Sequence, residues 1–195
     1  MIKSKEDYQF YLKADRIALG IDESENSWSL KKLVTPHPRW SFQKNLRRLE
    51  YYKNCRKDPI GRAIYYIYKY RFLKQSIRLG FSIPENVFGP GLAIAHYGTI
   101  IINDNARIGK NCRIHAMVNI GASGGSDRAP QIGDNVYIGP GAIIYGDIRI
   151  GSNTAISANS TVNKSFEQDG ILLAGSPARV IKEYDISNVI KRFGA

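Results

Sequence analysis

The chain has 195 residues, 43% of them hydrophobic, which is enough for one domain or for a small domain joined to a larger one. No stretch of about 18 uncharged apolar residues occurs, which argues against a membrane-spanning helix, and the charged N-terminus has no apolar block of a secretory signal. Two cysteines, Cys55 and Cys112, form no metal-binding pattern and are expected to be reduced thiols. These features predict a cytoplasmic protein that requires no metal.

Residues 1–80 are predicted to be helical. Residues 14–20 suit a short helix that ends at Gly20, and the chain is expected to be extended around Pro36 and Pro38. A second helix is predicted from Ser41 to Lys57, and a third from Pro59 to just before Gly80, since proline favours helix starts and glycine favours helix ends.

The net charge of +11 is concentrated in residues 39–78, which hold twelve basic residues and two acidic ones. Aromatic residues alternate with these cations between residues 65 and 78. A helix of this kind suits an anionic membrane surface, so a peripheral membrane contact through residues 39–78 is one interpretation. The other is that the aromatic side chains pack against the rest of the protein while the cations are solvated. Nucleic-acid binding is not expected, because no nucleic-acid-binding motif accompanies the charge.

A repeat of six residues begins near residue 81. Aliphatic residues recur at that spacing with one skipped position, Ser126, and small or β-branched residues often lie two positions before the next aliphatic one. A helix cannot keep a period of six in phase, whereas short strands separated by turns can. Glycine often follows the aliphatic residue, and we interpret it as the turn residue. The aliphatic positions are Ile102, Ile108, Ile114, Ile120, Ile132, Ile138, Ile144, Ile150, Ile156 and Val162.

Three such strands form one triangular coil of eighteen residues, and stacked coils bury a continuous aliphatic column. The first repeats run in a different phase, which predicts an irregularity around residues 99–101. The skipped position lies in a polar, glycine-rich segment, residues 122–131, that is expected to leave the column as a loop. After residue 181, Ile186, Val189 and Ile190 have helical spacing. The predicted organisation is a helical region (1–80), a column (81–181) and a short C-terminal helix (182–195).

Residues 81–181 resemble the hexapeptide-repeat acyltransferases, and the serine acetyltransferases in particular. The resemblance rests on AHYGT at residues 95–99, on GGSDRAPQIGD at residues 124–134 and on AGSPARVI at residues 174–181, in that order. It implies a mainly β protein, a left-handed parallel β-helix, that forms homotrimers and binds acetyl-CoA between neighbouring subunits. It further implies transfer of the acetyl group to a hydroxyl acceptor.

The resemblance assigns His96 the role of general base, because an alcohol needs proton removal to attack a thioester and imidazole suits this near neutral pH. His37 and His115 are the other histidines, and we expect neither to be the base. The acceptor site is expected to include Ala95, Tyr97, Asp127 and Arg128, the last as a bidentate partner for a carboxylate. Candidate residues for coenzyme A are Gly121, Ala142, Ala158, Lys164, Gly175 and Arg179.

Three positions depart from the serine acetyltransferase pattern. Ala95 stands where that family has an aspartate that binds the amino group of serine, Ala129 replaces a second histidine, and Phe81 replaces the aspartate that orients the base. A nearby carbonyl or Asp127 is expected to orient His96 instead. We therefore expect an O-acetyltransferase acting on a sugar hydroxyl in polysaccharide biosynthesis, with serine O-acetyltransferase as the alternative. A non-catalytic β-helix scaffold is the third hypothesis.

Overall fold

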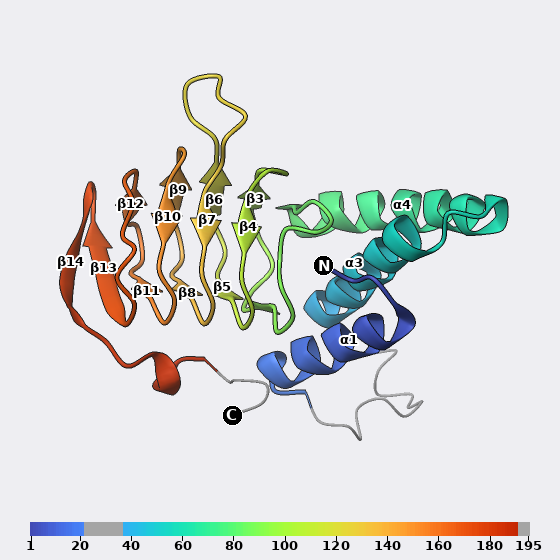
Figure 1. The fold of residues 1–195 in the computed structure, drawn as a ribbon, viewed down its shortest axis with the longest axis horizontal. Coiled ribbons are helices and arrows are strands. Elements are labelled where there is room, and N and C mark those ends of the chain that lie inside the picture. The colour runs from blue at the N-terminus through green and yellow to red at the C-terminus, as the bar shows by residue number, and fades with distance from the viewer. Residues whose placement is uncertain (22–36, 191–195) are drawn as a thin grey trace.

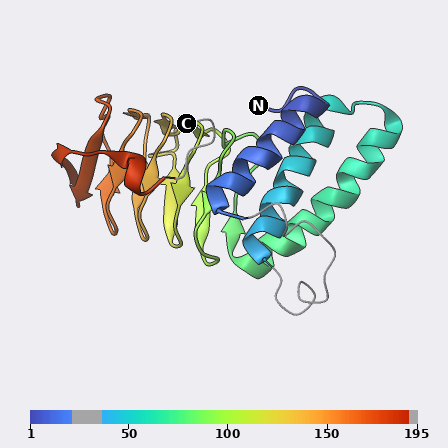
Figure 2. The ribbon, with the colours of Figure 1, turned by 90° about the horizontal axis from the view of Figure 1, so that it is seen from below.

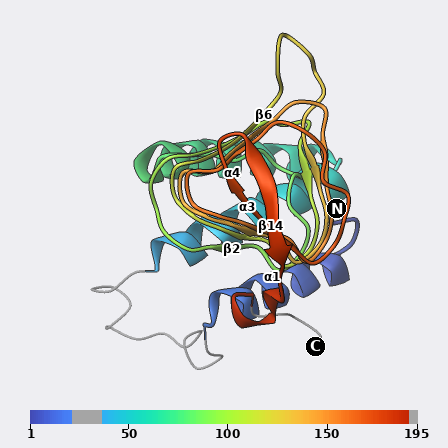
Figure 3. The ribbon, with the colours of Figure 1, turned by 90° about the vertical axis from the view of Figure 1, so that its left-hand side faces the viewer.

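The computed structural model describes residues 1–21 and 37–190, and its main feature is a column of short strands that starts at residue 81 (Figure 1). As predicted, the column is a left-handed parallel β-helix with three faces (Figure 3). Face A contains β1 (Phe81–Ser82), β3 (Ile100–Ile102), β6 (Val118–Gly121), β9 (Ile143–Tyr145) and β12 (Thr161–Val162). Face B contains β4 (Arg107–Ile108), β7 (Gln131–Ile132) and β10 (Arg149–Ile150). Face C contains β2 (Ala93–Ile94), β5 (Arg113–Ile114), β8 (Tyr137–Ile138), β11 (Ala155–Ile156), β13 (Ile171–Gly175) and β14 (Ala178–Glu183).

The predicted coil length and core are confirmed. Tyr137 in β8 pairs with Ala155 in β11, eighteen residues further along the chain. All ten aliphatic positions of the repeat point inward and are at most 5% exposed. Truncating such a side chain to alanine typically costs about 2–5 kcal/mol, so this stack of aliphatic residues is the main source of the column's stability.

The glycines that follow the aliphatic residues do not have the role that we predicted. Gly109, Gly133, Gly139 and Gly151 are absent from the positions with a left-handed backbone. A Cβ atom at Gly109 would instead lie 2.6 Å from the carbonyl oxygen of Gly133, and one at Gly151 would lie 2.6 Å from that of Gln168. Glycine is needed at these positions because adjacent coils approach closely there.

Asparagines occupy left-handed turns at the edge between faces B and C. Asn111, Asn135 and Asn153 have φ values of 56°, 55° and 54°. The Nδ2 of Asn111 donates to Oδ1 of Asn135 (2.9 Å), and Nδ2 of Asn135 donates to Oδ1 of Asn153 (3.0 Å). Asparagine tolerates this backbone better than most residues, and its amide can both donate and accept, so the three side chains link successive coils.

The helical region contains α1 (Lys5–Leu19), α3 (Pro38–Cys55) and α4 (Pro59–Leu79), with α3 between the other two (Figure 2). Gly20 and Gly80 end α1 and α4 in left-handed conformations, as predicted. Three boundaries differ from the prediction, since α1 already starts at Lys5 and α3 runs from Pro38 to Cys55 rather than from Ser41 to Lys57. The extended conformation predicted at Pro38 is wrong, because proline is tolerated at the first helical position, where no backbone N–H is needed. The extended conformation predicted at Pro36 lies outside the described residues.

A buried ionic cluster joins the helices to the first coil. Arg47 on α3 is fully buried and forms ion pairs with Asp15 on α1 (2.8 Å) and with Glu50 (3.0 Å). It also donates to the carbonyl oxygens of Phe88 (3.0 Å) and Gly89 (2.6 Å), while Asp15 accepts from two backbone N–H groups of the first coil. Burial is costly for these charges, but each has several partners, so the cluster fixes how the helices sit on the column.

The C-terminal segment covers part of face C. The predicted helix is a single 3₁₀ turn, η2 (Ile186–Asn188), and residues 191–195 lie outside the described part of the chain. Ile186 and Ile190 pack against Ala155 of β11. Within residues 1–21 and 37–190, no helix is long and apolar enough to cross a membrane.

Candidate active site

Two histidines lie on one edge of the column, which we call the histidine edge because His96 and His115 define it. This edge separates faces C and A. His96 follows β2 and is exposed, and His115 follows β5 one coil further on. Their ring centroids are 5.7 Å apart. The structure therefore places a second imidazole beside the predicted base, which the sequence did not predict.

The corner that carries His96 is longer than the other corners of the histidine edge. Ile94 and Ile100 are six positions apart in the sequence, whereas their partners in the next coil, Ile114 and Val118, are four positions apart. The predicted irregularity is thus confirmed and lies slightly earlier, over residues 95–99. The two extra residues let His96 and Tyr97 project from the column, and the Tyr97 side chain is exposed.

Helix α3 holds the strand that precedes His96. Arg39 donates through Nη1 to the carbonyl oxygens of Ile94 (3.2 Å) and Ala95. Gln43, one turn further along the helix, donates to the carbonyl oxygen of Leu92 (2.6 Å) and accepts from the N–H of Ile94 (3.2 Å). These contacts join segments about fifty residues apart in the sequence, so no local pattern indicated them.

His115 is half-buried, and its Nε2 has no hydrogen-bond partner within the described residues. Burial lowers the pKa of its imidazole below the usual value, and the nearby Arg113 and His96 lower it further. Its ring also meets the Tyr137 ring edge-on at 5.2 Å. His115 therefore presents a neutral ring to His96, with a nitrogen that lacks a partner.

The predicted loop leaves the column at the edge between faces A and B, which we call the loop edge (Figure 1). Arg107 and Gln131 are paired although 24 residues separate them, six more than a regular coil. The carbonyl oxygen of Asp127 accepts from Nδ2 of Asn105 (2.8 Å), and Arg128 forms an exposed ion pair with Asp147 (2.7 Å). The loop is thus attached to the coils on both sides while its two charged side chains face solvent.

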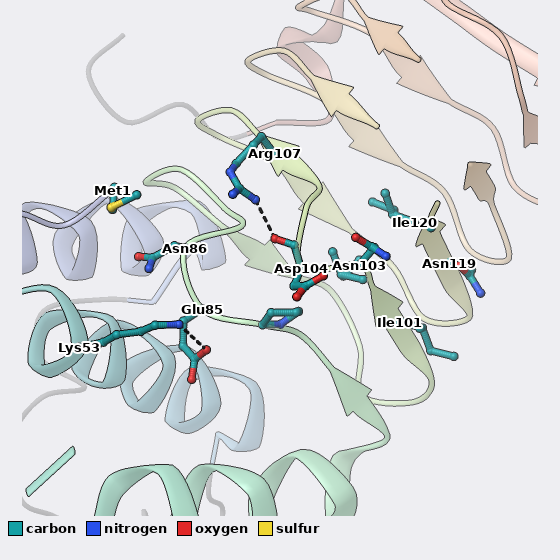
Figure 4. Close-up of a pocket in the computed structure, with 13 residues that line it drawn as sticks. Met1, Lys53, Glu85, Asn86, Ile101, Asn103, Asp104, Arg107, Asn119 and Ile120 are labelled. Atoms are coloured by element: carbon teal, nitrogen blue, oxygen red, sulfur yellow. Dashed lines mark hydrogen bonds and ion pairs between the residues drawn. The ribbon is translucent and has the colours of Figure 1, made fainter. Parts of the chain in front are cut away.

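Beside the loop, the same edge contains a groove of about 730 Å³ (Figure 4). Asn103 and Asp104 follow β3 at the groove, Asn119 and Gly121 come from β6, and Glu85 and Lys53 lie on the helical side. None of these except Gly121 was a predicted site residue. These residues offer two carboxylates, two amides and a lysine to a polar ligand, and the lysine is paired with Glu85 (3.3 Å).

The predicted site residues divide between the two edges within a single chain. His96, Ala95, Tyr97, Ala158 and Gly175 lie at or next to the histidine edge, because each follows or ends a strand of face C. Gly121, Asp127, Arg128 and Lys164 lie at the loop edge, and Arg179 is exposed on β14. Ala142 is buried, and both its N–H and its carbonyl oxygen bond within the column, so it presents no free polar group to a ligand.

At the three positions that depart from the serine acetyltransferase pattern, the residue present has no polar side chain. Phe81 lies in the core, edge-on to Phe42 at 4.8 Å, and Ala95 and Ala129 are buried. The structure does not show Asp127 orienting His96, since Asp127 follows a strand of face A and His96 one of face C. Among the described residues no group of three or more His, Cys, Asp and Glu side chains could hold a metal ion.

Comparisons with known proteins agree with this architecture. Residues 129–164 match the family model "Bacterial transferase hexapeptide (six repeats)". A serine acetyltransferase from Mycobacterium tuberculosis is 36% identical over 100 residues, covering 50% of this chain and 43% of that protein. A serine acetyltransferase from Staphylococcus aureus is 34% identical over 132 residues, covering 67% and 59%. The chain therefore spans about half the length of these curated relatives.

Solved structures extend the similarity into the helical region. The crystal structure of serine acetyltransferase from Brucella abortus matches 93% of this chain and 72% of its own, with a TM-score of 0.72 and 26% identity. That enzyme has also been solved in complex with coenzyme A, with a TM-score of 0.66. The chain is therefore a hexapeptide-repeat protein of the serine acetyltransferase-like kind.

Proposed function

We propose that this protein is an acetyl-CoA-dependent O-acetyltransferase in which His96 is the general base. The observation that carries the proposal is the exposed imidazole of His96 on a corner lengthened by two residues and held from behind by Arg39 and Gln43. These bonds fix the backbone from which the ring projects, which favours a defined position of the base relative to a bound substrate. The similarity to serine acetyltransferases supports acetyl-CoA as the acyl donor.

In the proposed reaction, His96 removes the proton of the acceptor hydroxyl as its oxygen attacks the thioester carbonyl. The bond from the carbonyl carbon to sulfur then breaks, and the proton passes from His96 to the departing thiolate, so the products are an acetyl ester and free coenzyme A. Proton transfer of this kind contributes about 10²–10⁴-fold to the rate.

We propose that the complete site forms between two copies of the chain in a homotrimer. His96 and Arg128 lie on different edges of one chain, and face A separates these edges. Face A exposes Ile101 and Ile143, with Met117 at its border, whereas the outward residues of face B are Arg107, Gln131 and Arg149. Exposed apolar side chains suit a subunit contact, and a neighbour packed on face A would bring its loop edge towards the histidine edge. Ala158 and Gly175 would then line the path of coenzyme A, with Lys164 and Arg179 as phosphate partners.

Serine is the acceptor that the comparisons favour, and the expected sugar acceptor is not supported by them. The alternative from the sequence, serine O-acetyltransferase, is therefore the first activity to test. One structural observation still favours a sugar hydroxyl: Ala95, at the position where the family has the aspartate for the amino group of serine, is buried and has no carboxylate to offer. Asp104 in the groove of the loop edge could bind that amino group from a neighbouring copy.

A panel of acceptors separates these possibilities. Coenzyme A release is measured with L-serine, with 3-hydroxypropionate, which lacks the amino group, with ethanolamine, which lacks the carboxylate, and with nucleotide-linked sugars. A charge-assisted hydrogen bond to the amino group is worth about 1.5–3 kcal/mol, so a true serine site should favour serine over 3-hydroxypropionate by about 10–150-fold in kcat/KM. Equal use of the two would point to a site without an amino-group partner.

His96→Ala is the control for every acceptor, and Asp104→Asn tests the proposed amino-group partner. Asp104→Asn should reduce kcat/KM for serine but not for 3-hydroxypropionate. Turnover of a sugar nucleotide but not of serine would support the second candidate. Binding of acetyl-CoA without turnover of any acceptor and without thioester hydrolysis would instead favour the non-catalytic scaffold.

A further inference from the structure

Helix α4 has two faces of different character. On the inner face, Phe72 stacks on Phe42 of α3 at a centroid distance of 4.9 Å, and Ser76 is buried. On the outer face, six large apolar side chains are between 54% and 74% exposed: Ile60, Tyr66, Ile67, Tyr70, Leu73 and Ile77. Scattered exposed apolar residues are ordinary, but a group of this size on one helix indicates a binding surface.

These six side chains form one continuous stripe. At about 100° per residue, Tyr66, Tyr70, Leu73 and Ile77 follow one another along a single line of the helix, with Ile60 and Ile67 beside it. The stripe lies away from the other helices, because α3 separates α4 from α1 and covers only its inner face (Figure 2). We call these six residues the apolar stripe.

Basic residues border the apolar stripe on both sides. By the same geometry, Arg62 and Lys69 lie along one border, Arg71 and Arg78 lie along the other, and Lys74 lies within the stripe. Helix α4 contains no acidic residue at all. Arg62, Arg71 and Arg78 form no ion pair within residues 1–21 and 37–190, whereas Lys69 pairs with Glu85, and the Lys74 ammonium lies 4.6 Å from the Tyr70 ring centre. Three cations are therefore available to an external anion.

The charges disfavour a second copy of α4 as the occupant of the stripe. Ala63, Tyr66, Tyr70, Leu73 and Ile77 have the spacing of a coiled-coil seam, whose flanking positions normally carry opposite charges that select the partner. In α4 the charged flanking positions are Arg62, Lys69 and Lys74, all basic. Two such helices side by side would bring like charges together.

We propose that α4 binds to the surface of an anionic lipid bilayer, lying parallel to it with the apolar stripe in the headgroup region. An interfacial helix combines an apolar face with lysine and arginine at its borders, and its binding depends on both apolar burial and attraction to anionic lipids. Its aromatic residues also suit this depth, since tyrosine has an apolar ring and a polar tip. Of the segment 39–78, only α4 has these properties, because α3 buries its apolar face against the column.

The C-terminal end of α4 adjoins the corner that carries His96. The last residue of α4, Leu79, accepts at its carbonyl oxygen from the N–H of Gly98 (3.0 Å), two residues after His96. In a homotrimer three copies of α4 would act together if they face the same way, so that weak individual binding becomes stable. The proposal does not depend on the acceptor and holds for a non-catalytic protein as well.

The test is co-sedimentation of the full-length protein with vesicles of phosphatidylcholine alone or of equal parts phosphatidylcholine and phosphatidylglycerol. Binding is expected only to the anionic vesicles and should weaken as salt is added, because salt screens surface charges. Arg71→Gln with Arg78→Gln should weaken binding about 25-fold, since each cation near an anionic surface contributes about fivefold. Leu73→Gln with Ile77→Gln should weaken it about tenfold per side chain.

Matched controls carry the same changes elsewhere on the surface. Arg149→Gln with Lys182→Gln removes two exposed cations from the column, and Val180→Gln with Ile181→Gln removes two exposed apolar side chains from β14. Both should bind the vesicles like the parent. As a second readout, Tyr70→Trp should show blue-shifted emission with anionic vesicles that the parent lacks.

Two results would overturn the proposal. The first is binding that is equal with both kinds of vesicle or is unaffected by the α4 substitutions. The second is a smaller oligomer for Leu73→Gln with Ile77→Gln in light scattering, together with unchanged vesicle binding, since the stripe would then be a contact between copies.

Discussion

The histidine edge and the loop edge are built in opposite ways. On the histidine edge, His96 follows a strand whose backbone is bonded by Arg39 and Gln43, and the neighbouring His115 is half-buried. On the loop edge, Asp127 and Arg128 are exposed on a loop six residues longer than a regular corner, and Arg128 pairs with the exposed Asp147. A rigid edge suits chemistry that needs fixed geometry, and an adaptable edge suits ligand recognition. One repeat can therefore provide both kinds of edge.

The largest effect is expected from the rigid edge. His96→Ala should lower kcat by about 10²–10⁴-fold, because it removes the proposed general base, and should leave thermal stability nearly unchanged because the side chain is exposed. Steady-state coenzyme A release measures the first quantity and calorimetry the second. His37→Ala, before α3, is the matched control and should keep parental kcat. A His96→Ala variant with more than half the parental kcat would contradict the assignment.

Oligomers that combine two variant chains test whether the histidine edge of one copy meets the loop edge of another. Arg128→Gln alone should raise the KM for an acceptor that has a carboxylate by about 10-fold or more, because a charged hydrogen bond is lost. Co-refolding Arg128→Gln chains with His96→Ala chains should restore activity at about one quarter of the sites, those pairing an intact His96 with an intact Arg128. If the mixture is no more active than the mean of its components, each chain has a complete site by itself.

A smaller effect is expected from the residues that support the rigid edge. Arg39→Gln removes a donor to the carbonyl oxygens of Ile94 and Ala95 and should lower kcat about tenfold with little change in KM, because the base is less well positioned. Arg39→Lys should recover part of the loss. An effect on stability alone, with kcat intact after folding is confirmed, would mean that these bonds serve only the fold.

The smallest effect concerns protonation of the second histidine. The pKa of His115 is lowered in the folded protein, so the unfolded chain takes up the proton first as the pH falls. Stability should therefore decrease as the pH drops through about 6.5 and level off below the folded-state pKa. His115→Gln removes this contribution, so the difference in Tm between pH 8 and pH 5 should shrink. An unchanged difference would show that the environment of His115 does not disfavour its charged form.

Much of the column could be predicted because its sequence pattern is local. Each inward aliphatic residue has the same environment in every coil, so a spacing of six residues predicts both the strands and the core, and the skipped repeat at Ser126 predicts the loop. The predicted division at residues 80 and 181 stays a prediction. The role of glycine was misjudged, since contact between coils, rather than turn geometry, excludes a side chain at Gly109 and Gly151.

In the candidate site, only residues that a motif and their chemical type identify could be predicted. His96 and Arg128 were identified by motif, but their separation onto two edges follows from the order of the three faces, which periodicity alone does not reveal. The hydrogen bonds from Arg39 and Gln43 to the strand before His96 join segments that are distant in sequence. The proximity of His115 to His96 is likewise a contact between different coils. No local pattern encodes such contacts, because they depend on how α3 packs on the first coil.

The rate at which the Cys112 thiol is labelled can be used to detect opening of the column. Its side chain is 1% exposed inside the stack, and burial strongly raises the pKa of its thiol, so an alkylating reagent cannot reach a reactive thiolate while the coils stay together. Cys55, near the end of α3, is only partly covered and should react sooner. Labelling of Cys112 would therefore report separation of the coils, whereas labelling of Cys55 does not require the coils to separate.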